Sequence, residues 1–405
     1  MTLLPLPRVR PQGQVPDAGT GTPAASGPGV PGGAPGAASS GPGGASSRPG
    51  AAPLGLGAAR IGAAGLGARP ALVDGFGRVH RDLRISLTDR CSLRCLYCMP
   101  AEGVPWLPKD TLLTTPEMVR IARAAVAAGV REIRLTGGEP LLRPDVVDVV
   151  AALAELRAPD DAPDAGTPVE LSLTTNGLAL PRVADRLVEA GLARVNISID
   201  TLDRERFATL TRRDRLDDVI AGIDAALAAG LAPVKLNAVA MRGVNDDEIV
   251  ALTRFAVERG CEMRFIEQMP LDAGHVWNRV EMVGGQEILD VLAREFTLTA
   301  VGDRGAAPAE KLLLDDGPAT VGVIASVTAP FCGSCDRVRL TADGYLRSCL
   351  FAREETDLRS VVRSGADDAA IDAALRACLA GKKAGHGIGD PDFEQPDRPM
   401  SAIGG

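Results

Sequence analysis

Strand-like and helix-like runs alternate between residues 83 and 267, and this alternation constrains the fold more than any other feature. Strands that alternate with helices along a chain pair in parallel through right-handed crossovers. The six strands expected here are fewer than the eight of a closed barrel. The sequence therefore predicts an α/β fold, a partial (βα)6 barrel of the TIM type whose mouth is covered by another part of the chain. The expected strands are 83–87, 131–136, 169–174, 194–199, 234–240 and 262–267, and the expected helices are 116–128, 144–156, 181–190, 216–229 and 246–259.

The ends of these helices carry recognisable signals. Thr115 is expected as the N-cap of the first helix, with Pro116 at the first helical position. Glycines follow the helical runs, and glycine is favoured just past a helix C-terminus. Residues 160–167 interrupt the alternation and are expected to form a loop insertion. The glycines are Gly129, Gly191, Gly230 and Gly260.

Three domains are predicted, because both ends of the chain depart from the alternating pattern. Residues 1–70 consist mainly of Gly, Ala, Pro and Ser and are expected to be disordered, since they offer too little apolar surface to bury. Their Pro and Gly density argues against an amphipathic targeting helix. The barrel is assigned to 71–269. Residues 270–405 are expected to form a smaller mixed domain, with a helix at 286–295 and a hairpin at 338–350 that turns at 342–344.

Charge and hydropathy exclude several kinds of partner. The formal net charge of −8 makes general nucleic-acid binding unfavourable. No apolar run reaches the ~18 residues that a membrane span needs. Eight cysteines without a recognisable secretory signal indicate a reducing compartment, and a cytoplasmic location is expected. Clustered cysteines in such a compartment more often bind metals or do redox chemistry than form disulfides.

A first group of cysteines follows the first predicted strand. It consists of Cys91, Cys95 and Cys98, spaced C-x₃-C-x₂-C. Three thiolates so close together can hold a [4Fe–4S] cluster and leave one iron open to a small molecule. The alternatives are a structural zinc site or three buried thiols. Zinc usually needs a fourth protein ligand, and no His or Cys lies nearby after His80.

A glycine pair follows the second predicted strand, in the segment 136–140. Gly137 and Gly138 would let the backbone approach a ligand closely, and Glu139 could accept a hydrogen bond from an ammonium group. The alternative is an ordinary strand-to-helix turn, which two glycines would also satisfy.

A second group of cysteines lies in the C-terminal region. It consists of Cys332, Cys335 and Cys349, spaced C-x₂-C-x₁₃-C. This spacing also fits a zinc ribbon in which His386 or Cys378 supplies the fourth ligand. Between these cysteines Arg337 and Arg339 alternate on an extended segment and would point the same way. Paired guanidinium groups suit a phosphate or a purine edge.

The pattern C-x₃-C-x-Y-C with a following Gly-Gly-Glu resembles the radical S-adenosylmethionine superfamily. Within it, the chain from about residue 75 to 405 resembles the GTP 3′,8-cyclase family of molybdenum cofactor biosynthesis. Two features depart from the family: the N-terminal extension, and Asp336, where Asn is equally expected. The resemblance rests on segments 83–91, 133–140, 174–177, 196–200, 264–267, 331–341 and 403–405.

The resemblance implies a role for particular residues. The first three cysteines would hold a [4Fe–4S] cluster that binds S-adenosylmethionine, and the second three a [4Fe–4S] cluster that meets the guanine. The S-adenosylmethionine site would comprise Tyr97, Gly138, Glu139, Ser198 and Met269. The GTP site would comprise Arg84, Arg134, Thr174, Lys235, Arg337, Val338 and Arg339. The catalytic set would be Arg337, Arg339, Gly404 and Gly405.

The residues alone leave other interpretations of these positions open. A single Arg or Lys is most often a solvated surface charge, although the shared position of these cations on successive strands argues against that. Met269 could simply pack in the core. A terminal Gly-Gly is most often frayed.

The resemblance also implies an activity. The chain would be a lyase in which a 5′-deoxyadenosyl radical removes the hydrogen at C3′ of GTP. Carbon C3′ would then attack C8, giving (8S)-3′,8-cyclo-7,8-dihydroguanosine 5′-triphosphate. Implied partners are a second copy in a homodimer, an unidentified electron donor, and the cyclic pyranopterin monophosphate synthase that uses the product. The alternatives are a twin-cluster radical enzyme that acts on a peptide, and a non-enzymatic zinc- or nucleotide-binding module.

Overall fold

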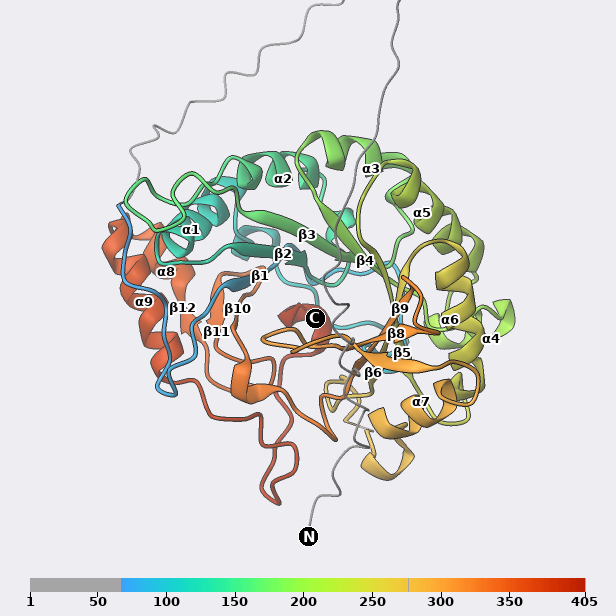
Figure 1. The fold of residues 1–405 in the computed structure, drawn as a ribbon. Helices are drawn as coiled ribbons and strands as arrows, with labels where there is room; N and C mark the ends of the chain where they lie inside the picture. The colour runs from blue at the N-terminus through green and yellow to red at the C-terminus, as the bar shows by residue number, and fades with distance from the viewer. Residues whose placement is uncertain (1–66, 276, 405) are drawn as a thin grey trace, which may run out of the picture. The chain divides into compact units, whose positions relative to one another are not determined.

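The computed structural model describes residues 67–275 and 277–404. The disorder predicted for residues 1–70 falls almost entirely outside these ranges. The described strands form one twelve-stranded sheet in the order β12-β11-β10-β1-β2-β3-β4-β5-β6-β9-β8-β7 (Figure 1). No helix within the described ranges is long and apolar enough to cross a membrane.

The centre of the sheet contains the six predicted strands, paired in parallel and in sequence order. They confirm the partial α/β barrel, and every strand begins and ends within one residue of its expected bounds. The strands are β1 (Asp82–Ser86), β2 (Glu132–Thr136), β3 (Glu170–Thr175), β4 (Arg194–Ser198), β5 (Val234–Ala240) and β6 (Glu262–Glu267).

Residues after 270 extend this same sheet at both edges. On one side β10 (Arg337–Leu340) pairs in parallel with β1, and β11 (Tyr345–Arg347) and β12 (Thr356–Asp357) follow in antiparallel order. On the other side β9 (Thr320–Ile324) pairs in parallel with β6 and carries the antiparallel strands β8 (Glu310–Leu314) and β7 (Leu298–Ala300). The predicted hairpin is β10–β11, whereas the pairing of its first strand with β1 was not predicted.

The helices that follow the central strands lie on the outer side of the curved sheet (Figure 1). They are α1 (Thr115–Ala127), α2 (Val146–Ala154), α3 (Leu180–Glu189), α5 (Leu216–Ala228) and α6 (Ile249–Glu258), the last preceded by the 3-10 turn η3 (Asp246–Glu248). The C-terminal region adds α7 (Gly285–Leu292), α8 (Leu358–Arg363), α9 (Asp368–Ala380) and α10 (Met400–Ile403). Helix α4 (Arg204–Thr211) was not predicted, and neither were α8, α9 and α10. The remaining 3-10 turns are η1 (Lys109–Thr111), η2 (Pro140–Leu142), η4 (Arg279–Glu281) and η5 (Cys332–Ser334).

The N-cap of α1 is Thr114, so the expectation of Thr115 was wrong by one residue. The Thr114 hydroxyl accepts from the Glu117 N–H at 3.4 Å, and the Glu117 carboxylate accepts from the Thr114 N–H at 2.7 Å. A capping box requires an acid three residues after the cap, and only Thr114 satisfies that spacing. The Thr115 hydroxyl instead donates to Asp145 at 2.6 Å. The prediction that glycines follow the ends of the helices is confirmed. The four residues with the expected positive φ are Gly129, Gly191, Gly230 and Gly260.

The two faces of the central strands differ in polarity. In β5, Val234, Leu236 and Ala238 are buried among apolar side chains on the helix side. Lys235 and Asn237 alternate with them and therefore face the inside of the curve. The inward face of the sheet thus carries polar and charged side chains, and the apolar core lies between the sheet and the helices.

Candidate active site

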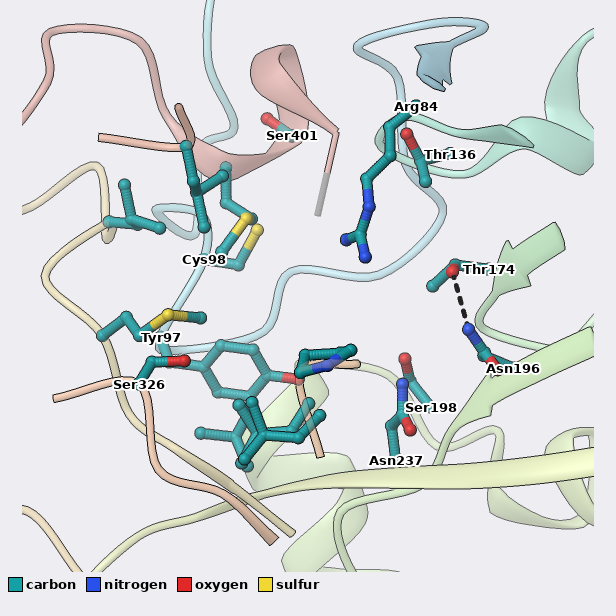
Figure 2. Close-up of a pocket in the computed structure, with 18 of the residues that line it drawn as sticks. Arg84, Tyr97, Cys98, Thr136, Thr174, Asn196, Ser198, Asn237, Ser326 and Ser401 are labelled. Carbon is teal, nitrogen blue, oxygen red and sulfur yellow. Dashed lines mark hydrogen bonds between the residues drawn. The ribbon is translucent and has the colours of Figure 1, made fainter. Parts of the chain in front are cut away.

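A cavity of about 320 Å³ opens on the inward face, where the parallel strands end. Functional side chains of α/β barrels gather at this end of the strands. Side chains from β1 to β5 point into the cavity (Figure 2), and residues of β6 and β10 also line it. The strand residues that line it include Arg84, Arg134, Thr136, Thr174, Asn196, Ser198, Asn237, Arg264, Ile266, Arg337 and Arg339.

The first three cysteines line this cavity from the loop after β1. The Cys91 sulfur accepts from the Leu93 N–H at 3.4 Å and faces the Asn176 side-chain amide at 3.9 Å. Burial raises the pKa of all three thiols, that of Cys98 to about 12. Buried thiols of this kind give up their protons when they bind metal. This donor set of three fits a cluster that keeps one iron open.

The second three cysteines belong to the C-terminal region and line the same cavity. Burial raises the pKa of Cys332. The pKa of Cys335 lies below its usual value, because the positive charges of Arg337 and Lys382 outweigh the effect of burial. Within the described part of the chain, no three His, Cys, Asp or Glu side chains are gathered around the position of one metal ion. The fit to a cluster therefore rests on the donor set.

Neither alternative fourth ligand for zinc is free. The His386 Nε2–H donates to the Ser326 carbonyl at 2.8 Å, and its Nδ1 accepts from the Ile388 N–H at 3.1 Å. Both ring nitrogens are thus engaged. Cys378 is buried in the apolar core on α9 and is absent from the residues that line the cavity. The zinc-ribbon interpretation would have to break these contacts.

The glycines after β2 allow two backbone segments to lie close together. A Cβ on Gly137 would lie 2.4 Å from the Thr88 carbonyl oxygen, and one on Gly138 would lie 2.5 Å from that of Arg90. The Gly138 N–H donates to the Thr88 carbonyl at 2.7 Å. These residues belong to the loop that carries the first cysteines. The glycines therefore hold that loop against the end of β2, and Gly138 also lines the cavity.

Glu139 lies behind the cavity wall and is 2% exposed. Its carboxylate accepts from the Leu141 N–H at 3.0 Å, the Thr175 hydroxyl at 2.7 Å and the Asn176 N–H at 2.7 Å. Burial raises its pKa. The carboxylate thus ties the end of β2 to the end of β3. Its binding of an ammonium group stays a prediction.

Five arginines surround the floor of the cavity: Arg84, Arg134, Arg264, Arg337 and Arg339. Burial, with the charge of a neighbouring arginine, lowers the pKa of Arg84 and of Arg339 to about 9. Asp82 is the nearest acid to Arg84, at 3.6 Å from its Nε. Buried atoms of Arg337, Nε and Nη2, have no hydrogen-bond partner among the described residues. Guanidinium groups with unused donors favour a polyanionic ligand.

Three other positions near the arginines differ in how they relate to the cavity. Lys235 lies on the inward face of β5 without lining the cavity, and burial with Arg264 lowers its pKa to about 8. Val338 is fully buried in the apolar core, so its side chain points away from Arg337 and Arg339. Burial and the charge of Asp82 raise the pKa of Asp336.

Tyr97 is positioned by an acid that sequence reasoning missed. The Tyr97 hydroxyl donates to Asp200 at 2.8 Å, and Asp200 also accepts from the Val239 N–H at 2.9 Å. Burial raises the pKa of Asp200 to about 6. Ser198 and Met269 line the same cavity as Tyr97 and Asp200. Asp200 follows Ser198 by two residues just past β4, and that spacing was an available signal.

The C-terminal segment reaches the arginines. Helix α10 lies within the curve of the sheet (Figure 1), and Ser401 lies on the same side of the cavity as Cys98 (Figure 2). Arg339 donates a hydrogen bond to the Gly404 carbonyl. A Cβ on Gly404 would lie 2.3 Å from the Thr136 hydroxyl, and its φ is +82°. Gly405 lies outside the described residues.

Two family models match the chain, and they define its class. The Radical SAM superfamily model matches residues 85–256, and the Molybdenum Cofactor Synthesis C model matches residues 261–388. Streptococcus suis SuiB, in its crystal structure with precursor peptide SuiA, shares the fold with a TM-score of 0.52 and 14% identity. That match covers 76% of this chain and 69% of SuiB. The chain is thus a radical S-adenosylmethionine protein with a C-terminal cysteine-bearing region.

Its relatives identify the family within that class. The GTP 3′,8-cyclase of Streptomyces coelicolor is 57% identical over 337 residues, covering 82% of this chain and 96% of the relative. The GTP 3′,8-cyclase of Mycolicibacterium smegmatis is 54% identical, covering 85% and 95%. This chain belongs to the GTP 3′,8-cyclase family. The family uses S-adenosylmethionine and [4Fe–4S] clusters.

Proposed function

We propose that this chain converts GTP to (8S)-3′,8-cyclo-7,8-dihydroguanosine 5′-triphosphate, the first step of molybdenum cofactor biosynthesis. The observation that carries the proposal is a single cavity that brings together both cysteine groups and five arginines, of which Arg84, Arg337 and Arg339 are buried. Cysteine groups and cations that line one cavity match a substrate that must be held by its triphosphate while its ribose reacts.

The bound groups supply the radical chemistry, and the chain supplies position. When bound, the first cluster and S-adenosylmethionine provide a carbon radical that removes the hydrogen at C3′ of GTP. In our proposal, Cys91, Cys95 and Cys98 hold the first cluster. Tyr97, Gly138, Glu139, Ser198 and Met269 contact S-adenosylmethionine, and Glu139 also ties the end of β2 to the end of β3. Positioning of this kind and exclusion of water are what proteins add to cofactor chemistry.

The arginines would orient the nucleotide. Arg134 and Arg339 pair with Arg84 across neighbouring strands, and all three line the cavity. They would bind the triphosphate, with Thr174 and Lys235 beside them. Cys332, Cys335 and Cys349 would hold the second cluster next to the guanine. Gly404, which accepts from Arg339, would fix that guanidinium during the reaction.

The cellular setting belongs to the same proposal. Eight cysteines, six of them in cluster-like groups, fit the reducing cytoplasm. A homodimer, an external electron donor and a cyclic pyranopterin monophosphate synthase that takes the product complete the expected partners. The synthase is required because the cyclised nucleotide is an intermediate, still a triphosphate.

An anaerobic assay tests the proposal. The reconstituted protein is incubated with dithionite and S-adenosylmethionine, with and without GTP, and mass spectrometry follows 5′-deoxyadenosine and a cyclised nucleotide. Both products should rise together with GTP, and deuterium placed at C3′ should appear in 5′-deoxyadenosine. Cys95→Ala should abolish both. Formation of 5′-deoxyadenosine with GTP unchanged would mean a different substrate, as in the peptide alternative.

A further inference from the structure

A buried lysine contacts the second group of cysteines. Lys382 follows α9 and is 5% exposed. Its ammonium donates to the Arg337 carbonyl at 2.7 Å and to the Cys335 sulfur at 3.5 Å. No carboxylate of the described residues lies within ion-pair distance of it. A buried charge is unfavourable unless an opposite charge compensates it. The one group in contact with Lys382 that can become an anion is the Cys335 thiol.

The electrostatics of the two partners agree with this pairing. Burial lowers the pKa of Lys382, and negative charge on Cys335 and Cys349 opposes that change. For Cys335, burial raises the pKa, and the charges of Arg337 and Lys382 more than reverse it. The two groups therefore attract each other across the 3.5 Å contact.

The segment that carries Lys382 is held against the cysteine loop by an arginine. Arg78 donates to the Cys332 carbonyl at 2.7 Å, to the Lys383 carbonyl at 2.8 Å and to the Ala384 carbonyl at 3.0 Å. Its Nε donates to Asp74 at 2.6 Å. Arg78 thus joins the two segments, so the place of Lys382 relative to Cys335 is built into the fold.

The first group of cysteines has no such contact. Burial raises the pKa of Cys91, Cys95 and Cys98. The nearest cation, Arg94, donates its hydrogen bonds to the Cys91 and Leu93 carbonyls instead of to a sulfur. A cation that contacts a cysteine sulfur therefore distinguishes the second site.

We propose that Lys382 is a positioning residue of the second cluster, whose ammonium compensates the charge of the Cys335 thiolate. This rests on the proposed function, which takes Cys332, Cys335 and Cys349 as cluster ligands. Compensation has two consequences. It favours retention of the cluster, since the ammonium, 3.5 Å from the Cys335 sulfur, attracts the thiolate and holds it in place. It also favours uptake of an electron by the cluster, because a nearby cation stabilises the added negative charge. The reduction potential of the cluster is therefore higher with the lysine present.

The test isolates the second cluster by replacing Cys91, Cys95 and Cys98 with Ala. In this background Lys382→Met is compared with Lys383→Met, a neighbouring exposed lysine. Iron bound per chain is measured after anaerobic reconstitution, and the midpoint potential by electron paramagnetic resonance. Lys382→Met should lose at least half of the iron. The midpoint potential of the cluster that remains should fall by about 59 mV, which corresponds to a tenfold less favourable one-electron reduction. Lys383→Met should change neither value.

Two further variants separate charge from folding. Lys382→Arg keeps the positive charge and should recover most of the potential. With Cys332, Cys335 and Cys349 replaced by Ala, Lys382→Met should leave the iron and the spectrum of the first cluster unchanged. Loss of iron there too would overturn the inference, because it would reveal a general folding defect.

The remaining outcomes distinguish this inference from the proposed function. Full iron content and an unchanged potential in Lys382→Met would overturn the role of Lys382 and leave the proposed function intact. Absence of iron from the unsubstituted background would overturn both the inference and the assignment of Cys332, Cys335 and Cys349 as ligands.

Discussion

Charged side chains on the inward face of the sheet lie where most barrels have aliphatic layers. Asp82, Arg84 and Arg339 are all less than 9% exposed. Burial lowers the pKa of both arginines, and Asp82 is the acid closest to Arg84. A polyanion that enters this cavity would supply the negative charge that the fold itself provides only in part. Single residues therefore decide what the cavity can bind.

Asp200 yields a prediction about pH. Burial raises its pKa to about 6 in the folded chain, against 3.8 for an ordinary aspartate. The folded state thus holds this proton more tightly, so the stabilising contribution is present at low pH and is lost as the pH rises through 6. Urea unfolding of the cluster-free chain is measured at about pH 4 and about pH 7. The free energy of unfolding should fall more between these two values in the unsubstituted chain than in Asp200→Asn, by up to about 3 kcal/mol. Parallel pH profiles for the two chains would contradict this assignment.

Gly404 yields a prediction about the C-terminal segment. In Gly404→Ala the added Cβ would meet the Thr136 hydroxyl at 2.3 Å, at a φ of +82° that alanine rarely adopts. The segment should leave its place beside Arg339, and formation of the cyclised nucleotide should fall at least tenfold. Gly385→Ala is the control, because its Cβ would meet nothing within 4 Å. Equal loss in both variants would argue against a specific contact.

At the scale of elements, α1 depends on its capping box. Thr114→Ala removes the hydroxyl that accepts from the Glu117 N–H. The free energy of unfolding should fall by about 1 kcal/mol, the usual cost of losing such a cap. Thr114→Ser keeps the hydroxyl and should retain most of that stability in urea unfolding. Since α1 lies on the outer side of the sheet (Figure 1), nucleotide cyclisation should be unchanged in both variants.

At the scale of the described unit, the C-terminal region completes the sheet. Strand β10 covers the edge of β1, and β9 covers the edge of β6. A chain that ends at residue 269 would expose both edges, which then pair with other chains. It should be recovered mainly as aggregate, whereas the full chain stays in solution, as sedimentation or gel filtration would show. A soluble, monomeric fragment would mean that residues 71–269 fold as an independent domain.

Local patterns in the sequence determined the central strands, most of their helices and the two groups of cysteines. Alternation of apolar residues specifies which face of β5 is buried, whatever packs against it. The capping position failed by one residue, because Thr114 and Thr115 are both good caps and only the contact with Glu117 separates them. The role of the glycines after β2 was also missed, since their neighbours, Thr88 and Arg90, lie on another strand's loop.

Tertiary structure alone decided what meets in the cavity. The pairing of β10 with β1 places Arg339 beside Arg84, although the two lie 255 positions apart in the sequence. The contacts of Lys382 with Cys335 and of Asp200 with Tyr97 likewise join residues that lie far apart in the sequence. The sequence by itself determined the elements and the donor atoms, since these depend on neighbours along the chain. Their charge and their partners were decided by tertiary structure, because burial and long-range pairing set both.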